Sequence, residues 1–160
     1  MRIYLIGLPG VGKSTIGKKL AEKIEYRFLD LDSYIEQKAM LFVDEIFKLY
    51  GEEYFRALET NTLCEISKLD DVVISCGGGI VKSPKNKDYI LGPCIYLKAD
   101  IVQIEERLRE SQIERPLLTT KTVLDLYKER KALYEDFATL EVENTDVEET
   151  IHLILKEIDI

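Results

Sequence analysis

The feature that most constrains the fold is a glycine-rich loop near the amino terminus, Gly7-Leu8-Pro9-Gly10-Val11-Gly12-Lys13-Ser14. It follows the apolar run 3–6 and precedes residues 14–24, whose apolar side chains recur at helical spacing. Strand, loop and helix in this order match the Walker A pattern, in which backbone N–H groups and the positive end of the helix surround a phosphate. The order G-x-x-G-x-G differs from the dinucleotide fingerprint G-x-G-x-x-G, which argues against a nicotinamide or flavin enzyme.

The loop predicts how a nucleoside triphosphate is held. We expect the ammonium of Lys13 to reach the β- and γ-phosphates, and the hydroxyl of Ser14 to ligate the Mg²⁺ ion that these phosphates share. The residues expected to contact the triphosphate are Gly10, Val11, Gly12, Lys13, Ser14 and Thr15. The alternative is a chance glycine turn between a strand and a helix, and the complete pattern in its required context argues against it.

The length and charge of the chain narrow the class of protein. Its 160 residues, 46% hydrophobic and 32% charged, indicate one globular domain that spans residues 1–160. The 30 acidic residues outnumber 22 basic ones, and the net charge of −8 disfavours nucleic acid and anionic membrane as partners. No apolar run approaches the roughly 20 residues of a membrane span, and no signal peptide precedes the first strand. We expect a cytoplasmic monomer.

The cysteines and the histidine do not suggest a metal or disulfide site. Cys64, Cys76 and Cys94 are odd in number and far apart, so we expect reduced core residues. His152 is the single histidine and falls in the amphipathic carboxy-terminal segment, where a surface position on a helix is expected. Catalysis is therefore expected to use other residues.

Apolar periodicity predicts strands that alternate with helices. The predicted strands are residues 3–6, 27–31, 72–75, 93–97 and 139–142. The predicted helices are residues 14–24, a segment that starts with the capping-box pair Ser33 and Glu36, a segment from Ile46 with a break near Gly51, and residues 101–108, 123–134 and 147–158. This alternation predicts an α/β fold in which helices cover both faces of a parallel sheet.

Ligands of such sheets bind beyond the carboxyl ends of the strands. The phosphate loop, Asp30, Asp32 and the glycine triplet 77–79 all fall at that edge. The sequence therefore predicts a single site there.

Five further segments carry a more specific combination of residues than the loop does. They are Asp30-Leu31-Asp32, Ile46-Phe47 through Gly51 to Glu59, Ser75 to Gly79, Arg115 to Leu118 and Glu129 to Tyr134. In this order, and with the phosphate loop, they resemble the shikimate kinase family.

The resemblance implies a fold and a reaction. The fold is the three-layer P-loop kinase fold, similar to that of nucleoside monophosphate kinases, with a central five-stranded parallel sheet and helices on both faces. A substrate-binding segment is implied at about residues 31–60 and a lid at about residues 110–121. The implied reaction transfers the γ-phosphoryl of ATP to the 3-hydroxyl of shikimate, on the route to chorismate and the aromatic amino acids.

Two aspartates stand beside the loop. Asp30 lies at the carboxyl end of the second predicted strand, one residue before its last. A carboxylate there can order the water shell of Mg²⁺, and the resemblance implies that role beside Ser14. Asp32 can accept hydrogen bonds from two hydroxyls of the acceptor and take the proton of the attacking one, so it is the candidate base or orienting group. The alternative is that both aspartates only stabilise the start of the following helix.

By resemblance, Arg56 and Arg130 bind the carboxylate of shikimate, a task that suits a planar guanidinium with two parallel donors. Taken alone, Arg56 has a simpler interpretation, because Glu52 and Glu59 stand four residues before it and three after it on a predicted helix. The two interpretations are compatible, since the glutamates can hold Arg56 in position.

The resemblance assigns roles to a glycine triplet and a lid. The backbone of Gly77, Gly78 and Gly79 would contact shikimate, with a flexible turn as the alternative. Arg115 in the lid would close over the phosphates and neutralise charge on the moving phosphoryl group, with an ordinary exposed arginine as the alternative. Arg109 and residues 144–146 stand in places that suit adenine contacts, but no residue pattern assigns them.

Two features depart from common patterns. The third strand ends at Ser75-Cys76 without a Walker B aspartate, and shikimate kinases share this absence. We therefore expect Asp30 to organise more of the second coordination shell of Mg²⁺. Ala132 replaces the proline that many members carry in Arg-x-Pro-Leu-Tyr, and we expect slightly looser backbone near Arg130.

Two other functions stay open. Gluconate kinases and nucleoside monophosphate kinases share the loop and lid, but they should not need the glycine triplet together with Arg56 and Arg130. A nucleotide-binding regulator without chemistry is the other alternative, and the intact Lys13, Asp32 and Arg115 argue against it.

Overall fold

The computed structural model describes residues 1–110 and 122–159. Its centre is a five-stranded parallel sheet with the strand order β2-β3-β1-β4-β5. The strands are β1 (Arg2–Ile6), β2 (Arg27–Asp30), β3 (Val72–Ser75), β4 (Cys94–Lys98) and β5 (Leu140–Glu143). β1 lies in the middle, and its residues Ile3 to Ile6 are fully buried, as expected for a parallel strand that is covered on both faces.

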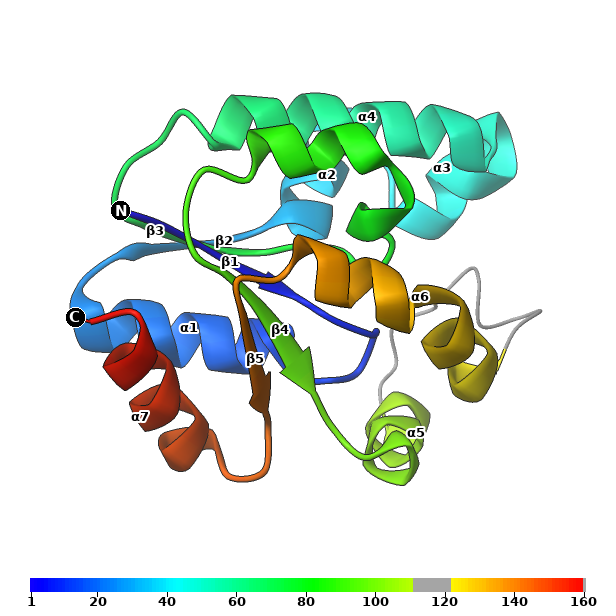
Figure 1. Ribbon diagram of the computed structural model, residues 1–160. Helices are drawn as coiled ribbons and strands as arrows, with labels where there is room; N and C mark the ends of the chain where they lie inside the picture. The colour runs from blue at the N-terminus through cyan, green and yellow to red at the C-terminus, as the bar shows by residue number, and fades with distance from the viewer. Residues whose placement is uncertain (111–121, 160) are drawn as a thin grey trace.

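Helices pack on both faces of this sheet. The α-helices are α1 (Lys13–Ile24), α2 (Leu31–Ala39), α3 (Val43–Tyr50), α4 (Glu52–Ile66), α5 (Ile101–Glu110), α6 (Val123–Phe137) and α7 (Val147–Glu157), and two 3₁₀ segments are η1 (Ile80–Lys82) and η2 (Pro84–Tyr89). Helices α1 and α7 cover one face, whereas α2, α4 and α6 lie on the other (Figure 1). The predicted three-layer α/β fold is confirmed.

One boundary differs from the prediction. The sequence suggested a strand through residue 31 and a helix that starts at Ser33 with a capping box to Glu36. Instead, β2 ends at Asp30 and α2 begins at Leu31, because the Asp30 carboxylate accepts a hydrogen bond from the backbone N–H of Ser33 at 3.0 Å. The true N-cap is therefore Asp30, and Asp32 lies inside the first turn of α2.

The break expected near Gly51 is confirmed. Gly51 ends α3 and begins α4 with φ of 88°, a left-handed value that favours glycine. The turn sets α3 against α4, and these two helices and α2 form a layer above the carboxyl end of β2 (Figure 1).

Other expectations concern the cysteines, His152 and the membrane. All three cysteines are free thiols, with Cys76 and Cys94 buried and Cys64 partly buried. His152 is exposed on α7, as expected. Among residues 1–110 and 122–159, no helix is both long enough and apolar enough to span a bilayer.

Candidate active site

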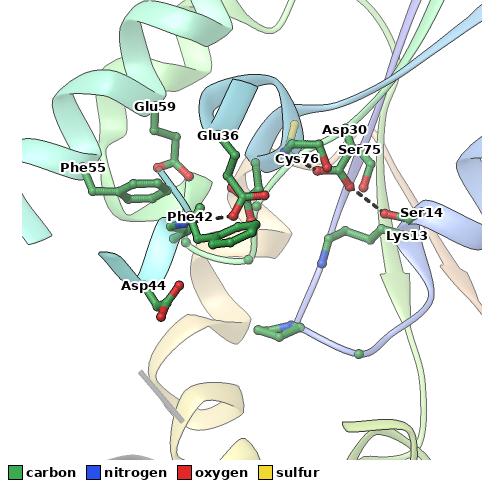
Figure 2. Close-up of a pocket in the computed structure, with 18 of the residues that line it drawn as sticks. Lys13, Ser14, Asp30, Glu36, Phe42, Asp44, Phe55, Glu59, Ser75 and Cys76 are labelled. Atoms are coloured by element: carbon green, nitrogen blue, oxygen red, sulfur yellow. Dashed lines mark hydrogen bonds between the residues drawn. The ribbon is translucent and has the colours of Figure 1, made fainter. Parts of the chain in front are cut away.

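A cavity of about 890 Å³ opens at the carboxyl ends of the strands. The phosphate loop, the junction of β2 and α2, helices α3 to α6 and the glycine triplet all contribute to its walls. Its lining residues include Pro9, Gly10, Gly12, Lys13, Ser14, Thr15, Asp30, Asp32, Glu36, Phe42, Asp44, Phe47, Phe55, Arg56, Glu59, Cys76, Gly77, Gly78, Gly79, Arg107 and Arg130. Figure 2 shows Lys13 and Ser14 on one side of this space and Glu59, Phe55 and Asp44 across it.

The phosphate loop runs directly into α1. Gly10 and Gly12 have φ of 83° and 100°, left-handed values that L-residues with a side chain rarely adopt. The Lys13 side chain is buried, and its ammonium donates to the backbone carbonyls of Gly7 at 2.8 Å and Leu8 at 3.0 Å. The lysine charge therefore lies within the loop, where an anion would be bound.

A hydroxyl and a carboxylate lie beside Lys13. The Ser14 hydroxyl donates to the Asp30 carboxylate at 2.7 Å, and Figure 2 marks this bond. The other oxygen of Asp30 caps α2, so both oxygens of its carboxylate are held by hydrogen bonds. A hydroxyl and a carboxylate are the oxygen ligands that Mg²⁺ prefers, and their place beside a phosphate-binding loop fits that ion.

The loop is held by two residues that the sequence did not single out for this role. The buried amide of Asn144 donates to the Val11 carbonyl at 2.9 Å, and its oxygen lies 3.2 Å from the hydroxyl of Thr150 on α7. A Cβ on Gly12 would stand 2.5 Å from the same amide nitrogen. Arg107 on α5 donates to the Val11 carbonyl at 3.0 Å.

These contacts bear on the residues suggested for adenine. Arg109 is exposed, whereas Arg107, two residues earlier on α5, faces the loop. The Asn144 side chain is turned toward Val11. A single sequence gives no signal that distinguishes the two arginines, because the choice depends on the phase of α5 relative to the loop.

The glycine triplet makes room for three charged side chains. A Cβ on Gly77 would stand 2.8 Å from Asp32 Oδ1, and one on Gly78 would stand 3.3 Å from Arg130 Nη1. A Cβ on Gly79 would overlap both terminal nitrogens of Arg56. The triplet therefore allows Asp32, Arg56 and Arg130 to pack against one stretch of backbone, which a sequence-based interpretation as a turn did not predict.

Arg56 is held from several directions. Its guanidinium pairs with Glu52 at 3.2 Å and with Glu59 at 3.0 Å, so the helical ion pairs expected from the spacing are present. The aromatic rings of Phe47 and Phe55 lie 6.0 Å and 5.3 Å from its Cζ. These contacts leave its side chain 13% exposed within the cavity.

Arg130 is almost completely buried, at 2% exposed, on the inner side of α6. Its Nε and Nη2 make no hydrogen bond to the residues that the structure describes. The hydroxyl of Tyr134, one turn along α6, donates to the Gly78 carbonyl, and burial raises the pKa of Tyr134 to about 12. Arg130 is among the residues that line the cavity, and two adjacent guanidinium donors of this kind are suited to a planar oxyanion.

Glu59 is a third carboxyl group at this place. Its side chain is fully buried, and its Oε2 would lie 3.1 Å from a Cβ on Gly77, close to Asp32. Burial raises the pKa of Glu59 to about 7; the Arg56 charge opposes the shift and the Asp32 charge adds to it. The sequence identified Glu59 only as a partner of Arg56, because helical spacing does not show burial.

Two predicted features remain. Arg115 and the proposed lid, apart from Glu110 at the end of α5, lie outside the described residues. Ala132 is exposed within helix α6, and the slightly looser backbone expected near Arg130 stays a prediction.

The fold and the site together define a class: a P-loop kinase that acts on a small molecule. The model of the shikimate kinase family matches residues 9–159. The chain belongs to that family.

Similar proteins agree with this assignment. A shikimate kinase of Alkaliphilus oremlandii is 36% identical, over 98% of this chain and 95% of the relative. A crystal structure of shikimate kinase from Bacteroides thetaiotaomicron has a TM-score of 0.90 at 30% identity, covering 100% of this chain and 99% of that one. Shikimate kinase from Acinetobacter baumannii, solved in complex with shikimate, has a TM-score of 0.84 at 30% identity, with 98% and 92% covered.

The hydrogen bond from Asn144 to the phosphate loop predicts that Asn144→Ala weakens ATP binding. Removing the amide leaves the Val11 carbonyl without its 2.9 Å donor, so we expect affinity for ATP to fall about tenfold. Calorimetric titration of the folded variant measures this. Thr145→Ala, at the exposed neighbouring position, is the matched control and should bind as the wild type does. Equal affinity in Asn144→Ala and the control would contradict the role of Asn144.

The raised pKa of Glu59 predicts that the stability of the folded protein depends on pH. Its pKa is about 7 in the folded protein against an ordinary value of 4.5, so between these values the folded state binds more protons than the unfolded state does. The contribution of Glu59 to stability is therefore lost as pH rises through this window. We expect the unfolding free energy of the wild type minus that of Glu59→Gln to fall by up to about 3 kcal/mol from pH 4.5 to pH 7.5.

Urea denaturation in pH steps measures this difference. Glu53→Gln, at an exposed position of the same helix, is the control and should keep the wild-type slope. A difference between wild type and Glu59→Gln that does not vary with pH would show that Glu59 titrates normally.

Proposed function

We propose that the chain transfers the γ-phosphoryl of ATP to the 3-hydroxyl of shikimate, which gives shikimate 3-phosphate and ADP on the route to chorismate and the aromatic amino acids. The observation that carries the proposal is Arg130, whose buried Nε and Nη2 have no hydrogen-bond partner among the described residues. A carboxylate that accepts from both nitrogens matches this pair of donors. Membership of the shikimate kinase family supports the choice of acceptor.

The acceptor would be held by the residues around the glycine triplet. Its carboxylate would bind to Arg130 and Arg56, and the backbone of residues 77–79 would contact its ring. Asp32 would accept hydrogen bonds from the hydroxyls at the other end. The support is that all these groups line one cavity with the phosphate loop.

The nucleotide would occupy the loop side of the cavity. Backbone N–H groups from Gly10 to Thr15 would surround the phosphates, and the Lys13 ammonium would exchange its carbonyl partners for phosphate oxygens. Ser14 and Asp30 would hold Mg²⁺, which when bound offsets phosphate charge during transfer. Arg115 would add positive charge above the transferring group.

Proton transfer falls to Asp32. Its carboxylate would orient the 3-hydroxyl and take up the proton as the oxygen attacks the γ-phosphorus. Phosphoryl transfer passes through a loose transition state, so orientation contributes more than strong base catalysis. Exclusion of water from the closed site would protect ATP from hydrolysis.

The organisation of the chain belongs to the same proposal. Residues 1–160 would form one P-loop kinase domain, with a substrate-binding segment at about residues 31–60 and a lid at about residues 110–121. In the described part, the first segment corresponds to α2, α3 and the start of α4. The protein would act as a cytoplasmic monomer with small-molecule partners only, and its net charge of −8 disfavours nucleic acid and anionic membrane.

A coupled assay tests the reaction. With MgATP, purified protein should release ADP when shikimate is added, and not when gluconate or AMP is added. The methyl ester of shikimate should be a poor acceptor, because it lacks the anion that Arg130 and Arg56 would bind. Activity with gluconate or AMP but not shikimate would reject the acceptor. The Lys13→Met variant is the control for contaminating kinases.

Arg56→Ala separates acceptor binding from nucleotide binding. The change removes a guanidinium that is 13% exposed, so KM for shikimate should rise at least about thirtyfold, while affinity for ATP stays within about twofold. Steady-state kinetics and ATP titration measure the two effects. Arg27→Ala, at an exposed position on β2, is the control and should change neither. Equal loss of both affinities would indicate misfolding and remove support for the assigned role.

A further inference from the structure

The charge balance around Arg56 raises a difficulty for binding a carboxylate. One guanidinium lies between Glu52 at 3.2 Å and Glu59 at 3.0 Å, so the three groups carry a net negative charge when both glutamates are ionised. A carboxylate ligand would meet repulsion from both. The charge of Arg130 acts on Glu59, so the carboxylate of Glu52 is the one that needs a positive group beside it.

Lys82 is that group. Its ammonium lies 2.6 Å from Glu52 Oε2, the same oxygen that Arg56 approaches at 3.2 Å. The lysine thus shares the carboxylate with Arg56 at the shorter distance. We infer that Lys82 is a positioning residue. By forming an ion pair with Glu52, it offsets the carboxylate charge that would otherwise act on Arg56 alone, so Arg56 stays available for the acceptor carboxylate.

The backbone connects Lys82 to the same place. Lys82 is the last residue of η1, and its N–H donates to the Gly79 carbonyl at 3.0 Å. Gly79 in turn packs directly against the guanidinium of Arg56. Gly79, Lys82, Glu52 and Arg56 therefore close a ring of contacts that joins the glycine triplet to α4.

Partial burial of Lys82 and Glu52 strengthens the interaction between their charges. The side chains of Lys82 and Glu52 are 27% and 35% exposed, so the pair is only partly screened by water. Burial favours the neutral acid at Glu52, but the hydrogen bond from Lys82 and the charges of Arg56 and Lys82 outweigh it and lower the pKa of Glu52. Glu52 is therefore ionised near neutral pH, and its charge must be offset.

The inference rests on the proposed function, in that shikimate is taken as the carboxylate ligand. Lys82→Met keeps the aliphatic stem and removes the charge. We expect KM for shikimate to rise about fivefold, with kcat and KM for ATP unchanged, because the pair acts on acceptor binding alone. Lys82→Arg should restore most of the lost affinity.

The chain offers a matched control. Lys38 pairs with Glu65 at 2.5 Å, and Glu65 lies on α4 as Glu52 does, but the ion pairs of Arg56 are with Glu52 and Glu59 and not with Glu65. Lys38→Met removes the same charge from the same kind of pair and should leave KM for shikimate unchanged. A rise in KM equal to that of Lys82→Met would show a general charge effect and overturn the inference.

A double variant tests the path through Glu52. If Lys82 acts by offsetting Glu52, Lys82→Met should raise KM for shikimate less in a Glu52→Gln background than in the wild type. Equal rises in both backgrounds, or equal changes in KM for shikimate and ATP, would contradict a positioning role. Wild-type turnover with shikimate is measured first: its absence rejects the proposed function, whereas normal turnover with unchanged KM in Lys82→Met rejects only the role of Lys82.

Discussion

The close approach of three charged side chains to one stretch of glycine backbone determines the rest of the site. Asp32 comes from α2, Arg56 from α4 and Arg130 from α6. A Cβ on Gly77 would stand 2.8 Å from Asp32 Oδ1, one on Gly79 would overlap the guanidinium of Arg56, and one on Gly78 would stand 3.3 Å from Arg130 Nη1. Because these charges are brought together away from water, each needs a partner or a ligand. Glu59 and Glu52 pair with Arg56 and Lys82 pairs with Glu52, whereas Arg130 keeps two donors unused among the described residues.

The parallel sheet brings these groups to the phosphate loop. β1 leads into the loop, β2 into Asp30 and α2, and β3 into the glycine triplet, and their carboxyl ends meet at one edge because the strands are parallel and adjacent. Phosphate-binding groups and acceptor-binding groups therefore share one cavity. The neighbouring strands β2, β3 and β1 bring together the phosphate loop, the two aspartates and the glycine triplet, and α6, which follows β4, adds Arg130.

Local patterns in the sequence predicted the fold and most of the candidate site, and long-range contacts account for the rest. The phosphate loop is contiguous, so its residues fix its conformation. The cap at Asp30 was missed because Ser33 and Glu36 offered a competing local pattern. The burial of Glu59 and the contact of Asn144 with Val11 depend on which elements pack together, and neither helical spacing nor residue type carries that information.

The link from Thr150 through Asn144 to Val11 has a consequence for biosynthesis. Asn144 lies 133 positions after the residue whose carbonyl it holds. During translation, the glycine-rich loop is therefore made early, the supporting Arg107 follows on α5, and Asn144 emerges only after the whole sheet has been synthesised. A nascent chain would display the signature of a nucleotide site before all the residues that support its loop are present.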